Sequence, residues 1–195
     1  LRRQRQMCIR DRSSYDAVLL AVGTHAEERL HVEGEDAAGV VDGVTFLRAV
    51  NIGERPSIGP RVLVIGGGNV AVDSARVALR LGAEDVQLAC LEDRNEMPAF
   101  RKELEGALEE GITFNCTWGP ERILVENGRV RGVEFKRCVS VWGPSRKFEP
   151  KYDPAQRLVL GADTVIVAIG QSPDLSFLAG SDAGDVLRGN MLRVN

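Results

Sequence analysis

The sequence predicts an α/β fold built around a mostly parallel sheet, and three observations carry this prediction. Two strand-like apolar runs, residues 62–65 and 85–91, follow each other with a helical repeat of small and apolar residues between them. A third apolar run, residues 163–169, ends in a glycine. A glycine turn joins the first run to the helical repeat. The run 62–65 is apolar throughout, which is typical of a strand that is buried on both faces.

The glycine turn, residues 66–68, is the most informative motif. Glycines here allow a tight turn, and the next helix, predicted from Asn69 to Leu81, would point its N-terminal N–H groups at an anion. Ala71 takes the place of the third glycine of the dinucleotide fingerprint and is small enough for close packing of helix on strand. The residues expected to lie on a dinucleotide are Gly66, Gly67, Gly68, Asn69, Val70 and Ala71.

The context of the turn supports a Rossmann-like dinucleotide-binding unit. Strand, turn, helix, second strand and a terminal acidic residue occur in the required order and spacing. The alternative, a purely structural glycine turn in another α/β protein, does not require this whole series.

Glu92 ends the second strand of the unit, at the spacing at which an acidic residue accepts hydrogen bonds from the adenine ribose of NAD. A carboxylate there would repel the 2′-phosphate of NADPH. The sequence therefore favours NADH. Arg94, two residues further on, would suit a phosphate, so NADPH stays open as the alternative.

Outside this unit the sequence predicts only the approximate bounds of helices, strands and loops. An apolar strand ends at Gly23, and a short helix is predicted over 43–52. Another helix is predicted to begin at Pro98 with Phe100 on its apolar face, and Asn127-Gly128 predicts a hairpin turn. The remaining expectations are loops over 25–43 and 139–156 and strands over 112–116 and 157–160.

Composition narrows the class of protein. A net charge of -3 gives no electrostatic case for nucleic acid or for an anionic membrane, and no run is long enough to cross a bilayer. The cysteines, residues 8, 90, 116 and 138, form no CxxC pair and no metal-binding spacing, so we expect no redox-active dithiol, no iron–sulfur module and no metal site in this chain. Scattered thiols fit a reducing, cytoplasmic setting. Cys90 and Cys116 are expected to act as small hydrophobic residues.

Several motifs together resemble one family, the pyridine nucleotide–disulfide oxidoreductase superfamily of FAD- and NAD(P)-binding flavoproteins. Within it, the chain is most similar to the glutamate synthase small subunit and related NAD(P)H-dependent oxidoreductases. The resembling segments are 20–24, 66–76 with 80–83, 96–99 and 168–174. The first and last resemble the crossovers between the FAD and NAD(P) domains, which implies that Gly23, Ile169 and Gly170 lie near bound nucleotide.

The resemblance implies four parts: a tail or non-domain sequence (1–14), a partial FAD-domain segment and crossover (15–43), the NAD(P)-binding domain with an inserted β-meander (44–166), and a truncated return to the FAD domain (167–195). The family's FAD-binding glycine fingerprint, its later glycine–aspartate motif and the iron–sulfur segment are not in this sequence. We therefore expect a fragment, inactive alone.

The implied function is hydride transfer from NAD(P)H to flavin and onward to an iron–sulfur domain, a partner subunit or another acceptor. Hydride transfer of this kind needs no catalytic acid or base in this domain, so we expect no catalytic residue here. Two alternatives stay open: a flavin-independent NAD(P) dehydrogenase, and a non-catalytic electron-transfer or binding subunit. Asp73 and Arg76 are expected to pair with each other, with contact to the cofactor as the alternative. Trp118 and Trp142 are expected to pack internally.

Overall fold

The computed structural model describes residues 26–176, together with residues 16, 21, 23, 24, 187, 188, 191 and 192. The chain divides into two compact units. One runs from Glu28 to Gly170, and the other consists of Leu1–Glu27 with Gln171–Asn195. The predicted tail, most of the predicted strand before Gly23, Cys8 and His25 lie outside the described residues.

A five-stranded parallel sheet forms the centre of the Glu28–Gly170 unit, in the order β2-β9-β3-β4-β5. This arrangement confirms the predicted α/β class. The strands are β2 (Val40–Asp42), β3 (Arg61–Ile65), β4 (Asp85–Cys90), β5 (Thr113–Cys116) and β9 (Thr164–Val167). The strand β2 lies within the segment expected to be a loop.

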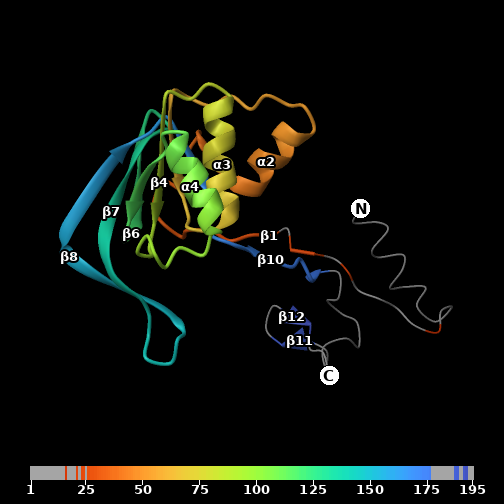
Figure 1. Cartoon of the computed structure of the whole chain (residues 1–195), viewed down its shortest axis with the longest axis vertical. Coiled ribbons are helices and arrows are strands. Elements are labelled where there is room, and N and C mark those ends of the chain that lie inside the picture. Colours follow the sequence, from red (N-terminus) through yellow and green to blue (C-terminus); the bar gives the residue numbers. More distant parts are fainter. Residues whose placement is uncertain are drawn as a thin grey trace. The chain divides into compact units, whose positions relative to one another are not determined.

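Strand β3 is buried on both faces because it has a different layer on each side. Val62 and Val64 belong to the apolar cluster under the helices, whereas Leu63 and Ile65 belong to the cluster under the antiparallel sheet. Successive side chains of a strand point to opposite faces, so a continuous apolar run is what this position requires. The unit therefore has three layers: helices, parallel sheet and antiparallel sheet (Figure 1).

Three helices, α2 (Gly43–Asn51), α3 (Asn69–Arg80) and α4 (Arg101–Glu109), form the first layer. Asp42 caps α2 by accepting a hydrogen bond from the Thr45 N–H at 2.8 Å. Helix α4 begins later than predicted. Phe100 is its N-cap and is 70% exposed, so the expectation that Phe100 lies on the apolar face is wrong.

Helices α3 and α4 are joined by ion pairs. The Arg76 guanidinium contacts Glu103 and Glu110, each at 2.6 Å. The prediction that Arg76 pairs with Asp73 is therefore wrong. Arg76 forms its ion pairs with acidic residues at helix α4 and not with a residue of its own helix. The hydrogen bond to Glu110 also raises the pKa of Arg76.

The third layer is the antiparallel sheet β6-β7-β8. Its strands are β6 (Trp118–Glu126), β7 (Arg129–Trp142) and β8 (Phe148–Gly161). Asn127 and Gly128 both have positive φ, 52° and 75°, as the predicted tight hairpin requires. The predicted loop over 139–156 is wrong, because β7 and β8 run through most of it. Trp142 is 52% exposed and stacks edge-on against Phe148 rather than packing internally.

An ion pair fastens β3 to the start of β9. Asp163 accepts hydrogen bonds from Arg61 Nη2 at 2.7 Å, Arg61 Nε at 3.0 Å and the Arg61 backbone N–H at 3.2 Å. These bonds to Arg61 hold the pKa of Asp163 below its usual range. A carboxyl whose pKa is lowered by folding stabilises the fold above its unfolded pKa, and this contribution is lost as the pH falls through the folded pKa.

Asp163→Asn is therefore expected to lower the free energy of unfolding by roughly 1–2 kcal/mol at pH 7. The difference from the parent should stay constant above about pH 5 and shrink below about pH 4, near the unfolded pKa of aspartate. Urea unfolding at pH 7 and pH 3 measures it. The exposed acid Glu84, changed to Gln, is the control, and an equal effect at both pH values would contradict the role of the Asp163 charge.

The second unit has little described structure. In it, β1 (Ala26–Glu27) pairs antiparallel with β10 (Gln171–Ser172), and β11 (Leu187–Arg188) with β12 (Met191–Leu192). Among the described residues, no helix has the length and apolar character needed to cross a membrane. The same part of the chain holds no group of three potential metal ligands.

Candidate nucleotide-binding site

The candidate site lies at the carboxyl edge of the parallel sheet, where β3 has β9 on one side and β4 on the other. From β3 the chain proceeds to β4 and β5 in one direction, whereas β9 and β2 extend the sheet in the other. Such a topological switch point leaves a crevice beyond the strand ends, and open α/β sheets bind ligands there.

Gly66 is the first residue of the turn after β3, and its lack of a side chain allows close backbone packing there. Its φ is 144°, and a Cβ on it would stand 2.2 Å from the carbonyl oxygen of Ala168. The Ala168 N–H in turn donates to the Ile65 carbonyl at 2.8 Å. The absence of a side chain at Gly66 therefore lets the segment after β9 close against the end of β3.

Gly68, the N-cap of α3, faces open space: a Cβ built on it would meet no atom within 4 Å. The first helical N–H groups to be satisfied belong to Ala71 and Val72, which both donate to the Gly68 carbonyl, at 3.0 and 3.2 Å. Within the described part of the chain, the N–H groups of Gly68, Asn69 and Val70 donate to no acceptor. Free N–H groups and the positive end of the helix dipole make this helix start suitable for a pyrophosphate.

The small side chain of Ala71 allows helix α3 to pack closely against the parallel sheet. It is completely buried in the cluster under the helices, and its Cβ lies 3.3 Å from the position that a Cβ on Gly66 would take. Any larger side chain at residue 71 would push α3 away from the turn. The third position of the fingerprint thus has a packing role, as its small residue predicts.

Glu92 follows β4 and reaches back to the turn. Its Oε2 lies 2.8 Å from the position that a Cβ on Gly67 would occupy. The backbone of Glu92 is fixed as well, since the Thr117 N–H donates to its carbonyl at 3.0 Å. The structure therefore brings the predicted acidic residue and the glycine turn together.

Arg94 extends in another direction. Its guanidinium carbon lies 5.5 Å from the centre of the Phe114 ring on β5. This is the geometry of a cation–π contact. Arg94 thus lies over Phe114 of β5, while the Glu92 side chain lies beside the turn.

The segment before α4 locks the turn in place, a feature that the sequence analysis missed. The Ala99 N–H donates to the Gly67 carbonyl at 3.1 Å, and the Phe100 N–H donates to Asn69 Oδ1 at 2.8 Å. Pro98 packs against the turn instead of starting a helix: its Cδ lies 3.3 Å from the position of a Cβ on Gly67. The similarity of residues 96–99 to the flavoprotein family was the available signal. The side-chain oxygen of Asn69 is thereby engaged.

Ile169 and Gly170 follow β9 at the same edge. Ile169 is 41% exposed, and Gly170 has a φ of 139°. Gly23 has a φ of 66° and belongs to the other unit. His31, the described histidine, is exposed in the segment before β2.

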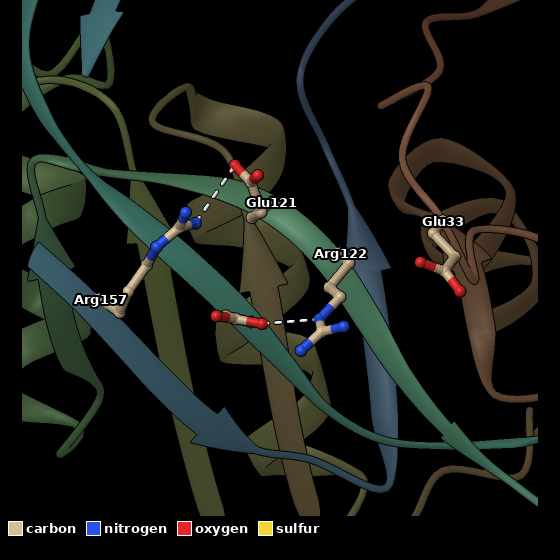
Figure 2. Close-up of a pocket in the computed structure, with 5 residues that line it drawn as sticks. Glu33, Glu121, Arg122 and Arg157 are labelled. Carbon is tan, nitrogen blue, oxygen red and sulfur yellow. Dashed lines mark hydrogen bonds and ion pairs between the residues drawn. The ribbon is translucent and has the colours of Figure 1, made fainter. Parts of the chain in front are cut away.

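A separate pocket lies on the antiparallel sheet (Figure 2). Arg122 Nε contacts Glu134 at 2.6 Å, and Glu121 contacts Lys136 Nζ at 2.7 Å and Arg157 at 3.5 Å. The hydrogen bond from Lys136 lowers the pKa of Glu121. Because these charges neutralise one another, we assign the pocket no ligand. The lining residues are Glu33, Glu121, Arg122, Glu134 and Arg157.

Comparisons with known proteins agree with this geometry. The chain is 42% identical over 184 residues to the NADPH-Fe(3+) oxidoreductase subunit beta of Geobacter sulfurreducens, covering 92% of this chain and 27% of that one. It is 37% identical over 175 residues to the glutamate synthase [NADPH] small chain of Escherichia coli, covering 83% and 37%. The chain therefore spans between about a quarter and two fifths of the length of these curated relatives.

Among solved structures, a mutant of FprA from Mycobacterium tuberculosis has the same fold, with a TM-score of 0.70 and 19% identity over 81% of this chain and 51% of that one. The family model described as pyridine nucleotide-disulphide oxidoreductase matches residues 4–195. The glycine turn, the switch point and the inserted antiparallel sheet thus have one common explanation: the chain belongs to the pyridine nucleotide-disulphide oxidoreductase family.

Proposed function

We propose that this chain is the NAD(P)H-binding part of a FAD-dependent oxidoreductase, in which a hydride passes from NAD(P)H to flavin and then to an iron–sulfur or other acceptor. The observation that carries the proposal is the open start of α3 over Gly68, with free N–H groups at the switch point. The relatives support it, because the names of both include NADPH, and one is a glutamate synthase small chain.

The residues at the turn fit a dinucleotide. We assign the pyrophosphate to the N–H groups of Gly68, Asn69 and Val70, and the adenine ribose to the Glu92 carboxylate. Ile169 and Gly170, at the edge of the same crevice, would lie along the cofactor toward the nicotinamide. When bound, the nicotinamide supplies the hydride; the residues of this chain align it and exclude water.

The flavin belongs to the full-length protein in this proposal. The chain carries one glycine fingerprint, and that one is assigned to NAD(P)H. We place the reaction in the cytoplasm, where scattered reduced thiols are expected. An iron–sulfur domain or subunit as the next acceptor is the further step, suggested by the glutamate synthase relatives.

The test of this function is anaerobic mixing of the full-length protein with NADH and with NADPH. We expect bound flavin in the purified protein and loss of its oxidised absorbance on mixing. A protein without flavin that still oxidises NADH with a soluble substrate would favour the flavin-independent dehydrogenase. Bound flavin that neither nucleotide reduces would favour a non-catalytic binding role.

NADH is the favoured cofactor in this proposal, although the relatives' names specify NADPH. The Glu92 carboxylate stands beside the turn, where a 2′-phosphate would meet its negative charge. Arg94, the alternative phosphate ligand, is placed over Phe114. This arrangement supports recognition of an unphosphorylated ribose.

Glu92→Ala should weaken NADH binding about tenfold, the value of one hydrogen bond to a charged group, while NADPH binding stays equal or improves. Calorimetric titration with both nucleotides measures this. Glu96→Ala, the change of an exposed acid in the same segment, is the matched control and should alter neither affinity. An equal loss for NADH and NADPH in Glu92→Ala would remove Glu92 from the specificity argument.

A further inference from the structure

Two cysteines, Cys90 and Cys116, face each other at the carboxyl edge of the sheet. They are register partners at the ends of the parallel strands β4 and β5. Both side chains are on the helix-facing side, because Cys90 belongs to the apolar cluster under the helices and Cys116 packs against the same cluster. Neighbouring strands lie about 4.8 Å apart, within the Cα separation that a disulfide spans.

The two thiols have different surroundings. Cys90 is 2% exposed, whereas Cys116, at the carboxyl end of β5, is partly exposed. The Cys90 thiol donates to the Glu92 carbonyl oxygen at 3.6 Å. Hydrogen bonding from Cys90, aided by the charge of Arg94, lowers the pKa of Cys116, while the same contact and burial raise the pKa of Cys90.

We propose that Cys90 and Cys116 form a redox-reversible thiol pair, which a hydroperoxide converts to a disulfide between β4 and β5. The Cys116 thiolate attacks the O–O bond, becoming a sulfenic acid and releasing an alcohol, or water when hydrogen peroxide is the oxidant. The Cys90 sulfur then attacks the sulfenic sulfur, forming the S–S bond and releasing water. Two thiols are thus oxidised by two electrons, and one peroxide bond is reduced.

A disulfide between Cys90 and Cys116 would be strained and therefore easily reduced. In a regular parallel pair, opposite side chains start about one strand spacing apart, whereas the Cβ atoms of a disulfide are about 3.8 Å apart. Forming the bond must therefore pull the two strand ends together. Disulfides held under such strain are the more easily reduced and regulatory ones.

The same movement reaches the nucleotide turn. Glu92 lies two residues beyond Cys90, and the Thr117 N–H, next to Cys116, already donates to its carbonyl at 3.0 Å. Displacing these strand ends displaces the Glu92 carboxylate from Gly67. This consequence rests on the proposed nucleotide site, whereas formation of the disulfide does not.

Peptide mapping tests the thiol pair. The purified protein is treated with hydrogen peroxide, its remaining thiols are blocked with N-ethylmaleimide, and it is digested with trypsin without reduction. Trypsin separates the two cysteines by cleaving after Arg94 and Lys102. We expect a peptide that joins Cys90 to Cys116 and disappears on reduction with dithiothreitol.

Variants make this result specific. Cys116→Ser should abolish the joined peptide, and Cys90→Ser should leave Cys116 as a sulfenic acid that dimedone traps. Cys138→Ser, which removes a buried thiol on β7, should leave the crosslink unchanged. The proposal is overturned if oxidised wild-type protein keeps Cys116 free to react with N-ethylmaleimide, or if its crosslink instead uses Cys138.

Nucleotide titration then tests the consequence. The oxidised protein should bind NADH roughly fivefold more weakly than the reduced protein, and dithiothreitol should restore binding. A crosslink with unchanged affinity would show that the pair does not act on the turn. If neither form binds nucleotide, the proposed function fails, while the thiol chemistry is judged by the peptide map alone.

Discussion

Gly68→Val is expected to abolish nucleotide binding without unfolding the protein. Gly68 has a φ of −90° and a ψ of 176°, extended backbone that valine adopts readily, and a Cβ there meets nothing within 4 Å. The new side chain therefore occupies the space in which a pyrophosphate would approach the free N–H groups of α3. We expect the affinity for NADH to fall by roughly a hundredfold or more, which is about 2.7 kcal/mol.

Calorimetric titration measures this loss, and thermal melting shows whether the fold is kept. Gly106→Ala is the matched control. This glycine lies within α4, where a Cβ would meet only ordinary contact with Arg76 at 3.5 Å. The Gly106→Ala protein should bind nucleotide with the same affinity as the parent. A folded Gly68→Val protein with normal affinity would show that the start of α3 is not the binding site.

Gly66→Ala, two residues earlier, is expected to act on stability instead. The added methyl group would stand 2.2 Å from the Ala168 carbonyl oxygen and 2.8 Å from its carbonyl carbon, at a φ of 144° that alanine rarely adopts. The Ala168 backbone cannot yield easily, because its N–H is bonded to the Ile65 carbonyl. We expect the free energy of unfolding to fall by roughly 3 kcal/mol or more, as measured by urea denaturation.

Gly82→Ala separates the two causes of this loss. Gly82 also has a positive φ, 103°, but a Cβ on it would meet no atom within 4 Å. Its substitution carries backbone strain alone and should cost about 1–2 kcal/mol. If both variants lose the same free energy of unfolding, the Ala168 backbone must move to accommodate the new methyl group. Gly66 would then have no special packing role.

The core of the fold is predictable because its signals are local. The apolar run of β3, the glycine turn and the small residues of α3 follow one another within about one supersecondary unit, and each residue type has a direct physical reason there. The tight hairpin turn at Asn127-Gly128 is local in the same way.

The extent of β8 could not be predicted from such signals. Pro150 and Pro154 interrupt its alternation, and proline normally argues against a strand. The three-stranded sheet resolves this conflict, because β8 is an edge strand, where a missing N–H donor is tolerated. This segment forms a strand because it pairs with β7, and no local signal in the segment itself predicts that pairing.

Parts of the candidate site were also beyond local reasoning. Asn69 is bonded to the Phe100 N–H, 31 residues away, and no spacing rule predicts such a partner. The cross-helix partners of Arg76 lie 27 and 34 residues along the chain, and they displace the nearer Asp73. In contrast, the position of Glu92 beside the turn follows from its spacing alone, because the end of β4 must lie beside the turn after β3.

Calorimetric titration of the purified protein and of Gly68→Val with NADH and NADPH in parallel decides whether the open start of α3 binds a dinucleotide. The parent should bind nucleotide, NADH more tightly than NADPH, and Gly68→Val should bind neither. A demonstrably folded parent that binds neither nucleotide would contradict the claim that the open start of α3 is a dinucleotide site.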